Sequence, residues 1–213
     1  LWYVIALKGY EEMNQLAGEA EEAAWARTTA DKLRKVFHRT FWNGKYYISP
    51  GYQGKPDDRA QALAVVSGVL PKELYPVIRS FFSTWYHASP YMEKYVLEAL
   101  CTMGYYQDAL NRMKLRYRVM IESPLTTLWE GWGIGSEGFG GGTYNHAWSG
   151  GPLTILSQYI AGIETLEPAF RTFRVAPHPA HLNFIRTQVP LSGGRRIVFE
   201  MDKSAHSGTM YLR

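Results

Sequence analysis

The sequence lacks the features that mark several large classes of protein. Its one cysteine, Cys101, excludes an internal disulfide. The apolar opening at residues 1–7 is too short to span a membrane and has no basic leader or cleavage site, so we expect a helix there and no membrane partner. No methionine precedes it, which suggests a piece of a longer protein whose N-terminus and any export signal lie elsewhere.

Signatures of cofactor, metal and nucleophile sites are also missing. Residues 133–138 fit G-x-G-x-x-G, but no strand precedes them and no helix follows at once, so they lack the context of a dinucleotide site. Histidines are scattered without ligand spacing, and His178 and His181 stand in a segment broken by prolines. No G-x-S-x-G elbow is present. We therefore expect no cofactor and no metal in the site; a structural calcium ion is not decided by these residues. The glycines instead permit a loop that can close over a ligand.

Net charge is low. The formal charge is +4 on 213 residues, and the densest basic run, at residues 112–118, alternates with apolar side chains as a solvated helix face does. We therefore expect no nucleic-acid partner. Hydrophobic residues make up 46% of the chain, enough for a real core, and 15 tyrosines and 7 tryptophans exceed what packing usually requires. This surplus suits carbohydrate binding and a generously packed helical domain equally well.

A helical period dominates up to residue 167. Residues 19–37, 89–103 and 105–120 each keep one face apolar. Ser89-Pro90 is a good helix start, with a capping hydroxyl and a proline at the first helical position. Because only Gly104 separates the second of these helices from the third, they are expected to form an antiparallel hairpin.

Two further segments predict helices with no polar side. Residues 60–70 and 152–163 are apolar nearly all round and must be covered on every side. One-sided outer helices combined with enclosed inner helices predict a mainly α fold, an α/α toroid of helical hairpins. A stacked solenoid would need a repeat of fixed period, which the sequence does not have.

The period changes to two after Pro168. We expect a helical barrel portion over residues 1–168 and a C-terminal antiparallel β-sandwich portion over residues 169–213. Four short strands are few for a self-sufficient sandwich, so this portion is expected to be truncated. A small hairpin is expected around Asn43-Gly44. The expected strands are residues 173–175, 182–189, 196–200 and 209–212.

The most informative feature is a glutamate between two tryptophans. Glu130 stands between Trp129 and Trp132, and a second aromatic segment follows after the glycine-rich residues. Aromatic faces stack on the C–H faces of a pyranose, while a carboxylate binds hydroxyls and moves protons. A solvated loop position is the usual fate of a glutamate, but the indoles would exclude water and place a ring beside this one. Glu130 is therefore the candidate catalytic residue, with Trp129 and Trp132 as candidate substrate-binding residues.

The second segment, residues 144–152, adds three candidate substrate-binding residues. His146 stands just before a Ser-Gly-Gly-Pro helix entry, which favours ligand contact, although a histidine alone is more often a satisfied core residue. Tyr144 and Trp148 fit either sugar stacking or a place in the core.

Glycoside hydrolysis needs a second carboxyl group. Glu93, Glu98 and Glu137 are candidates, but none has aromatic flanks like those of Glu130. Asp57 and Asp58 precede an apolar helix, where negative charge suits the positive end of the helix dipole. Capping therefore accounts for at least one of these two aspartates.

Five segments, taken in order, resemble bacterial α-L-rhamnosidases. Thr-Thr-Leu-Trp-Glu at 126–130 and His-Ala-Trp-Ser at 146–149 are the specific part, and the resemblance runs through nearly the whole chain. It implies the C-terminal half of an (α/α)6 barrel and the start of a C-terminal β-sandwich. It also implies inverting hydrolysis of terminal α-L-rhamnose from a glycoside or polysaccharide, with Glu130 as general base and His146 among the residues that shape the rhamnose pocket. The five segments are residues 58–64, 89–100, 126–130, 144–152 and 161–163.

The resemblance further implies that part of the site is absent. In the family the general acid comes from an earlier part of the barrel, which would precede Leu1, so the chain alone is expected to be inactive. Uncovered inner helices would expose apolar faces that a homo-oligomer could hide. Two other interpretations stay open: a barrel of this kind acting on another sugar, and a non-catalytic sugar-binding or scaffold domain. The compartment, periplasmic or cytoplasmic, is not decided by these residues.

Overall fold

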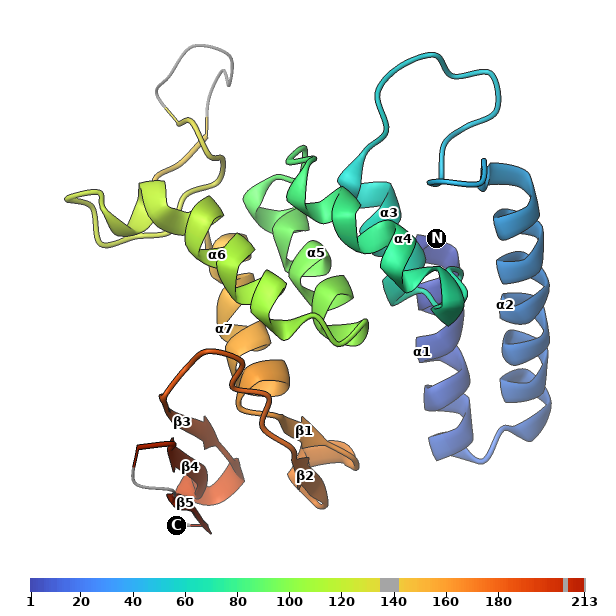
Figure 1. Cartoon of the computed structure of the whole chain (residues 1–213). Coiled ribbons are helices and arrows are strands. Elements are labelled where there is room, and N and C mark those ends of the chain that lie inside the picture. Colours follow the sequence, from blue (N-terminus) through green and yellow to red (C-terminus); the bar gives the residue numbers. More distant parts are fainter. Residues whose placement is uncertain (135–141, 205–206, 213) are drawn as a thin grey trace. The chain divides into compact units, whose positions relative to one another are not determined.

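The computed structural model describes residues 1–134, 142–204 and 207–212 (Figure 1). None of the helices among these residues is long and apolar enough to cross a membrane. The α-helices are α1 (Trp2–Ala17), α2 (Ala20–Phe41), α3 (Asp58–Val66), α4 (Tyr75–Arg79), α5 (Pro90–Thr102), α6 (Tyr106–Ile121) and α7 (Gly151–Ile155). The strands are β1 (Ile163–Thr165), β2 (Phe173–Val175), β3 (Phe184–Pro190), β4 (Arg196–Asp202) and β5 (Ser207–Leu212).

The chain forms two compact units, which are described separately. The first contains residues 1–88 and 98–103, and the second contains residues 89–97 and 104–213. The first two turns of helix α5 therefore belong to the second unit, and its last turn belongs to the first unit. The boundary predicted between residues 168 and 169 was set by the change of period in the sequence and stays a prediction; strand β1 lies before it.

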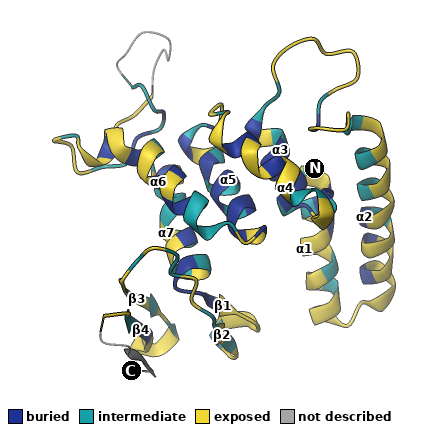
Figure 2. Ribbon diagram, in the orientation of Figure 1, coloured by how far each residue is buried: buried dark blue, intermediate teal, exposed yellow. Residues whose placement is uncertain are grey.

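Helices α1 and α2 form an antiparallel hairpin in the first unit (Figure 1). Gly18 ends α1 at φ +81°, a left-handed conformation that glycine adopts without strain. The small side chains of Ala26 and Ala30 let the two helices approach closely, and they pack with Val4 and Leu7. Most other residues of this hairpin are exposed, whereas α3 is almost entirely buried, as predicted for its apolar sequence (Figure 2).

The predicted hairpin near Asn43-Gly44 is reduced to a single antiparallel bridge between Trp42 and Tyr47. A buried amide replaces the expected ladder: Gln61 Nε2 donates to Tyr47 O and Tyr47 N donates to Gln61 Oε1, each at 2.8 Å. These two hydrogen bonds attach the loop to α3. They also pair the polar atoms of the Gln61 side chain, which would be costly to bury without partners.

The predicted hairpin of α5 and α6 is confirmed, and buried polar groups hold it together in the second unit. Glu93, fully buried on α5, accepts two hydrogen bonds from Arg112 of α6, from Nε at 2.5 Å and from Nη2 at 3.0 Å. Tyr117 donates its hydroxyl to Pro90 O at 3.1 Å. Burial, with a smaller contribution from the charge of Glu93, raises the pKa of Tyr117, so this donor stays neutral.

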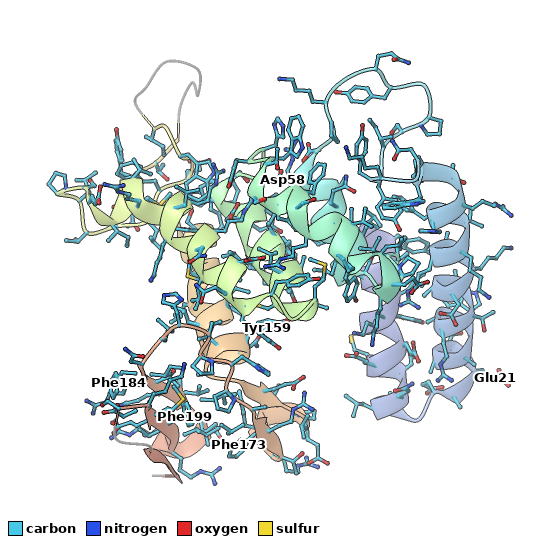
Figure 3. All side chains as sticks on the ribbon, in the orientation of Figure 1. Glu21, Asp58, Tyr159, Phe173, Phe184 and Phe199 are labelled. Atoms are coloured by element: carbon cyan, nitrogen blue, oxygen red, sulfur yellow. The ribbon has the colours of Figure 1, made fainter. Side chains whose placement is uncertain are left out.

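The four strands predicted near the C-terminus are present. Strands β3, β4 and β5 form an antiparallel sheet in that order, and β2 pairs antiparallel with β1. Strand β1 was not expected from the sequence, because Ile163 directly continues an apolar helical segment. Phe199 is buried in the core of this region and Phe173 packs against it (Figure 3).

The segment predicted as one enclosed helix, residues 152–163, differs from that prediction. Helix α7 ends at Ile155 and a π-helical turn, Leu156–Ile160, continues it. Leu153 is 75% exposed and Leu156 is 39% exposed, so enclosure on every side is wrong for these residues. They line a cavity of about 470 Å³ with Ile121 of α6.

Candidate functional site

The two aromatic segments singled out in the sequence lie side by side in the second unit. Glu130 N donates to Thr143 O at 2.9 Å, and His146 N donates to Leu128 O at 2.8 Å. These two backbone hydrogen bonds pair residues 128–130 with residues 143–146, across a glycine-rich stretch of which residues 135–141 lie outside the described part of the chain. Glu130 and His146 thus lie on two neighbouring backbone segments that are hydrogen-bonded to each other.

In the part of the chain that the structure describes, one oxygen of the Glu130 carboxylate makes all of its hydrogen bonds. Oε2 accepts from Thr143 N at 2.9 Å and from Thr143 Oγ1 at 3.4 Å, and it lies 3.6 Å from His146 Nδ1. The side chain is 26% exposed. Among the described residues no group hydrogen-bonds to the other oxygen, Oε1. Among the described residues, the carboxylate is therefore held at one oxygen, and the other has no hydrogen-bond partner that would prevent it from accepting a proton from a bound water.

His146 is oriented by the same threonine. Its Nδ1 lies 3.1 Å from Thr143 Oγ1, and its ring lies 4.1 Å from the Trp148 ring. Trp148 Nε1 in turn donates to Glu130 O at 3.2 Å. His146 is the residue just before the short helix Ala147–Gly150, which leads into α7, as its sequence position predicts.

The two tryptophans that flank Glu130 are embedded in the surrounding structure. Trp129 is only 8% exposed and meets Tyr144 edge to face at 5.3 Å. The guanidinium of Arg116 lies 4.3 Å from the centre of the Trp132 ring, and Tyr117 meets this ring edge to face at 5.0 Å. Burial favours a packing role for Trp129, whereas Trp132 keeps a partly exposed ring. Their roles toward a sugar stay predictions.

Tyr144 and Trp148 are the more accessible aromatic residues of the site. They are 43% and 42% exposed, and the Tyr144 hydroxyl donates to Ile134 O at 2.9 Å. Exposure suits the ligand-contact alternative better than the core alternative for both. Their predicted substrate contact is compatible with this geometry and stays a prediction.

Three residues that the sequence did not single out lie in or beside the site. Thr143 links Glu130 to His146; Ser149, fully buried, donates its hydroxyl to Trp129 O; and Tyr91 packs against Trp148 at 5.5 Å. Thr143 and Ser149 stand next to or inside the second aromatic segment, which was the available signal. Tyr91 follows Ser89-Pro90, a segment that was interpreted as a helix start and as part of the family resemblance, with no role in the site.

Of the three candidates for a second carboxylate, Glu93 lies in the same compact unit as Glu130. Glu93 is wrong for this role, because it is fully buried and paired with Arg112, and Arg116 Nε lies 3.6 Å from it. Glu98 belongs to the other compact unit. Glu137 lies outside the described residues.

The aspartates at the start of α3 have structural partners. Asp57 is its N-cap, accepting from Arg59 N at 2.9 Å, so the capping interpretation is confirmed. Asp58, fully buried, accepts from His87 N at 3.1 Å (Figure 3). Within the described part of the chain, no three His, Cys, Asp or Glu residues come together as metal ligands would.

Comparison with known families gives one match. The family described as bacterial alpha-L-rhamnosidase 6 hairpin glycosidase domain matches residues 1–160. A comparison with curated proteins finds no match.

Several solved structures resemble the chain. A GH78 family rhamnosidase of Bacillus sp. GL1 is 27% identical, with a TM-score of 0.77 over 92% of this chain and 22% of its own. An α-L-rhamnosidase from Dictyoglumus thermophilum is 21% identical, with a TM-score of 0.77 over 94% of this chain and 23% of its own. One from Aspergillus terreus is 18% identical, with a TM-score of 0.68 over 92% of this chain and 24% of its own.

The chain thus spans between a fifth and a quarter of the length of these proteins. The predicted fold, a mainly α partial (α/α)6 toroid of helical hairpins with a C-terminal antiparallel β appendage, is confirmed by the helical hairpins, the sheet and these structural neighbours.

Proposed function

Because the chain belongs to the bacterial α-L-rhamnosidase six-hairpin glycosidase family, we propose that it carries the general base of an inverting hydrolase. This hydrolase removes terminal α-L-rhamnose from a glycoside or polysaccharide. The observation that carries the proposal is the Glu130 carboxylate, with Oε2 held by Thr143 and Oε1 open.

The proposed step is a single displacement. Oε1 of Glu130 accepts a proton from a water molecule as the water oxygen forms a bond to the anomeric carbon. The glycosidic C–O bond breaks, and the leaving oxygen receives a proton from a general acid. The two carboxyl groups of such a pair stand roughly 6.5–9.5 Å apart, which leaves room for the water.

Thr143 keeps the base aimed during this step. Its backbone N–H and its hydroxyl both hold Oε2, so the carboxylate cannot rotate Oε1 away without breaking two hydrogen bonds. The hydroxyl also meets His146 Nδ1, which leaves His146 Nε2 to contact a sugar hydroxyl. Trp148, Trp132 and Tyr144 supply the aromatic walls of the pocket.

The general acid is proposed to come from a part of the protein outside these 213 residues. Glu93 is ion-paired with Arg112 and is fully buried. Its carboxyl group therefore has no exposed oxygen that could donate a proton to a leaving group. The chain by itself is therefore expected to hydrolyse no rhamnoside at a useful rate.

The test is turnover of an aryl α-L-rhamnoside by the complete gene product and its Glu130→Gln and Glu130→Ala variants. Loss of a general base is expected to lower kcat by about 10² to 10⁴. Glu122→Gln, which changes an exposed glutamate of a surface pair, is the matched control and should keep wild-type turnover. Wild-type rates in both Glu130 variants would exclude Glu130 as the base.

Two product analyses sharpen the mechanism. Proton NMR of the first-formed sugar should show β-L-rhamnose if the reaction inverts the anomeric carbon. Azide needs no base, so added azide should restore consumption of an activated aryl rhamnoside by Glu130→Ala and yield β-rhamnosyl azide. Sugar binding by the wild-type protein without turnover of any glycoside would instead favour a carbohydrate-binding domain.

A further inference from the structure

A row of aromatic rings leads away from the proposed base. The His146 ring lies 4.1 Å from Trp148, Trp148 lies 5.5 Å from Tyr91, and Tyr91 meets Tyr95 edge to face at 5.9 Å. Trp148 and Tyr91 are 42% and 39% exposed. The row thus joins the loop that carries Glu130 to the first turns of α5, and two of its central rings are accessible to a ligand.

Several contacts hold this row in place. Trp148 Nε1 donates to Glu130 O at 3.2 Å, so the indole has a fixed position relative to the base. Gly151 brings the start of α7 against α5, because a Cβ at this position would lie only 2.5 Å from Lys94 Cβ. Tyr117 anchors Pro90, the residue before Tyr91. An accessible ring that is already fixed loses little side-chain entropy on binding.

We propose that Trp148 and Tyr91 form the platform for the leaving group, namely the ring that is attached directly to the scissile rhamnose. The inference rests on the proposed function. An enzyme that removes a terminal rhamnose binds a single sugar ring, the rhamnose itself, on one side of the bond that breaks. The anomeric carbon of this rhamnose must lie within reach of the water held by Glu130. Aromatic surface that continues past Trp148 to Tyr91 therefore serves the other side of the bond.

The chemistry of the platform defines the class of ring. Indole and phenol faces pack against an apolar face, which is either the C–H face of a pyranose or a planar phenolic ring. The platform residues carry no formal charge, so a neutral ring is expected. A rhamnosyl-glucose disaccharide and an aryl rhamnoside represent the two sources of such a ring.

The experiment compares substrates with and without a leaving-group ring in the complete gene product. α-L-Rhamnosyl fluoride, whose leaving group is one atom, is the reference substrate. Tyr91→Leu is expected to lower kcat/KM about 3- to 10-fold for the disaccharide, the aryl rhamnoside or both, mainly through KM, and to leave the fluoride unchanged. Tyr91→Phe keeps the ring and should behave as wild type.

Each outcome either supports the leaving-group platform or overturns it. Unchanged turnover of the fluoride by Tyr91→Leu also shows that the variant is folded. An effect on the disaccharide alone assigns a sugar to the platform, and an effect on the aryl rhamnoside alone assigns a phenolic ring. Equal losses on all three substrates, or no loss on any, would overturn the inference while leaving the proposed function intact. A wild-type protein that hydrolyses none of them overturns the proposed function and this inference with it.

Discussion

Glu93 and Glu130 belong to the same compact unit and have the same side chain, but their surroundings differ in every respect. Glu93 is fully buried and shares its charge with two arginines, whereas Glu130 is partly exposed and contacts a threonine and a histidine. Both oxygens of Glu93 accept hydrogen bonds, whereas within the described residues only one oxygen of Glu130 does.

These surroundings determine which of the two carboxylates can exchange a proton with a ligand. A buried charge must be neutralised by partners, and those partners then prevent it from exchanging protons with a ligand. A carboxylate that is held at one oxygen keeps its orientation and can still accept a proton at the other. The two glutamates are therefore expected to respond in opposite ways to the same substitution.

Glutamine at each position gives the largest expected contrast. Glu93→Gln leaves the charges of Arg112 and Arg116 in the interior without their carboxylate and should lower the free energy of unfolding by about 3–5 kcal/mol. Glu130→Gln should change it by less than about 1 kcal/mol, because the site is partly exposed. Urea unfolding of the chain and its variants at neutral pH measures both.

The control for this contrast is an exposed ion pair. Glu122→Gln breaks the pair with Arg118, whose side chain is 69% exposed, and should cost at most about 0.5 kcal/mol. If Glu93→Gln proved as mild as Glu122→Gln, the buried network would not be the structural element that we describe.

Gly142 tests how sensitive the open carboxylate is to its loop. Its φ is +122°, and a Cβ there would lie 3.1 Å from Ile134 Cδ1 and 3.5 Å from Glu130 Oε2. Gly142→Ala should therefore introduce about 1–3 kcal/mol of strain, shift Thr143 away from Oε2 and lower kcat/KM of the complete gene product about 10-fold.

Gly18→Ala is the matched control for this substitution. Gly18 also has a positive φ, +81°, but a Cβ there would meet no atom within 4 Å. The Gly18→Ala substitution should therefore lower the free energy of unfolding without changing kcat/KM. Equal activity of Gly142→Ala and wild type would show that the loop does not fix the carboxylate.

A smaller effect is expected at the threonine itself. Thr143→Val removes the hydroxyl that joins Glu130 to His146 and leaves the backbone hydrogen bond to Oε2 in place. One such hydrogen bond contributes about 1 kcal/mol, so kcat/KM should fall about 5-fold. Thr143→Ser, which keeps the hydroxyl, should retain nearly full activity in the same assay. Identical rates for the two variants would assign the hydroxyl no part in orienting the base.

The sequence predicted the helices and most strands because their apolar period is local information. The hairpin of α5 and α6 could be predicted from two apolar helix faces, the helix start at Ser89-Pro90 and the helix end at Gly104. The network of Glu93 with Arg112 could not, because the two residues are 19 positions apart and each is ordinary on its own helix. Long-range pairing of this kind is invisible to a periodic pattern.

For the candidate site too, the residues that are close in sequence could be predicted, and the contacts made between distant segments could not. Glu130, His146 and Trp148 could be singled out because unusual residues stand close together in the sequence, and the structure places them in contact, while their roles stay predictions. Tyr91 was missed, since its contact with Trp148 is made through the packing of α7 against α5. The enclosure expected for residues 152–163 was wrong for Leu153, because an apolar sequence does not say which segment covers it.

A third carboxylate, Asp57, shows whether the comparison extends to a capping role. Burial alone would raise its pKa, but hydrogen bonds from the side chain and backbone of Arg59, together with the charge of Arg59, outweigh burial and lower the pKa. Asp57→Ala removes the cap of α3 and should cost about 1 kcal/mol at pH 7. Asp57→Asn keeps an acceptor at the cap and should cost less.

The pH dependence of this last effect follows from the lowered pKa. The ionised Asp57 stabilises the folded chain at pH values above its ordinary pKa, and this contribution is lost as the pH falls through the lower pKa of the folded state. The difference in unfolding free energy between wild type and Asp57→Ala should therefore shrink as the pH is lowered from 5 toward 2. A difference that stays constant over this range would mean that the cap acts without its charge, unlike Glu93.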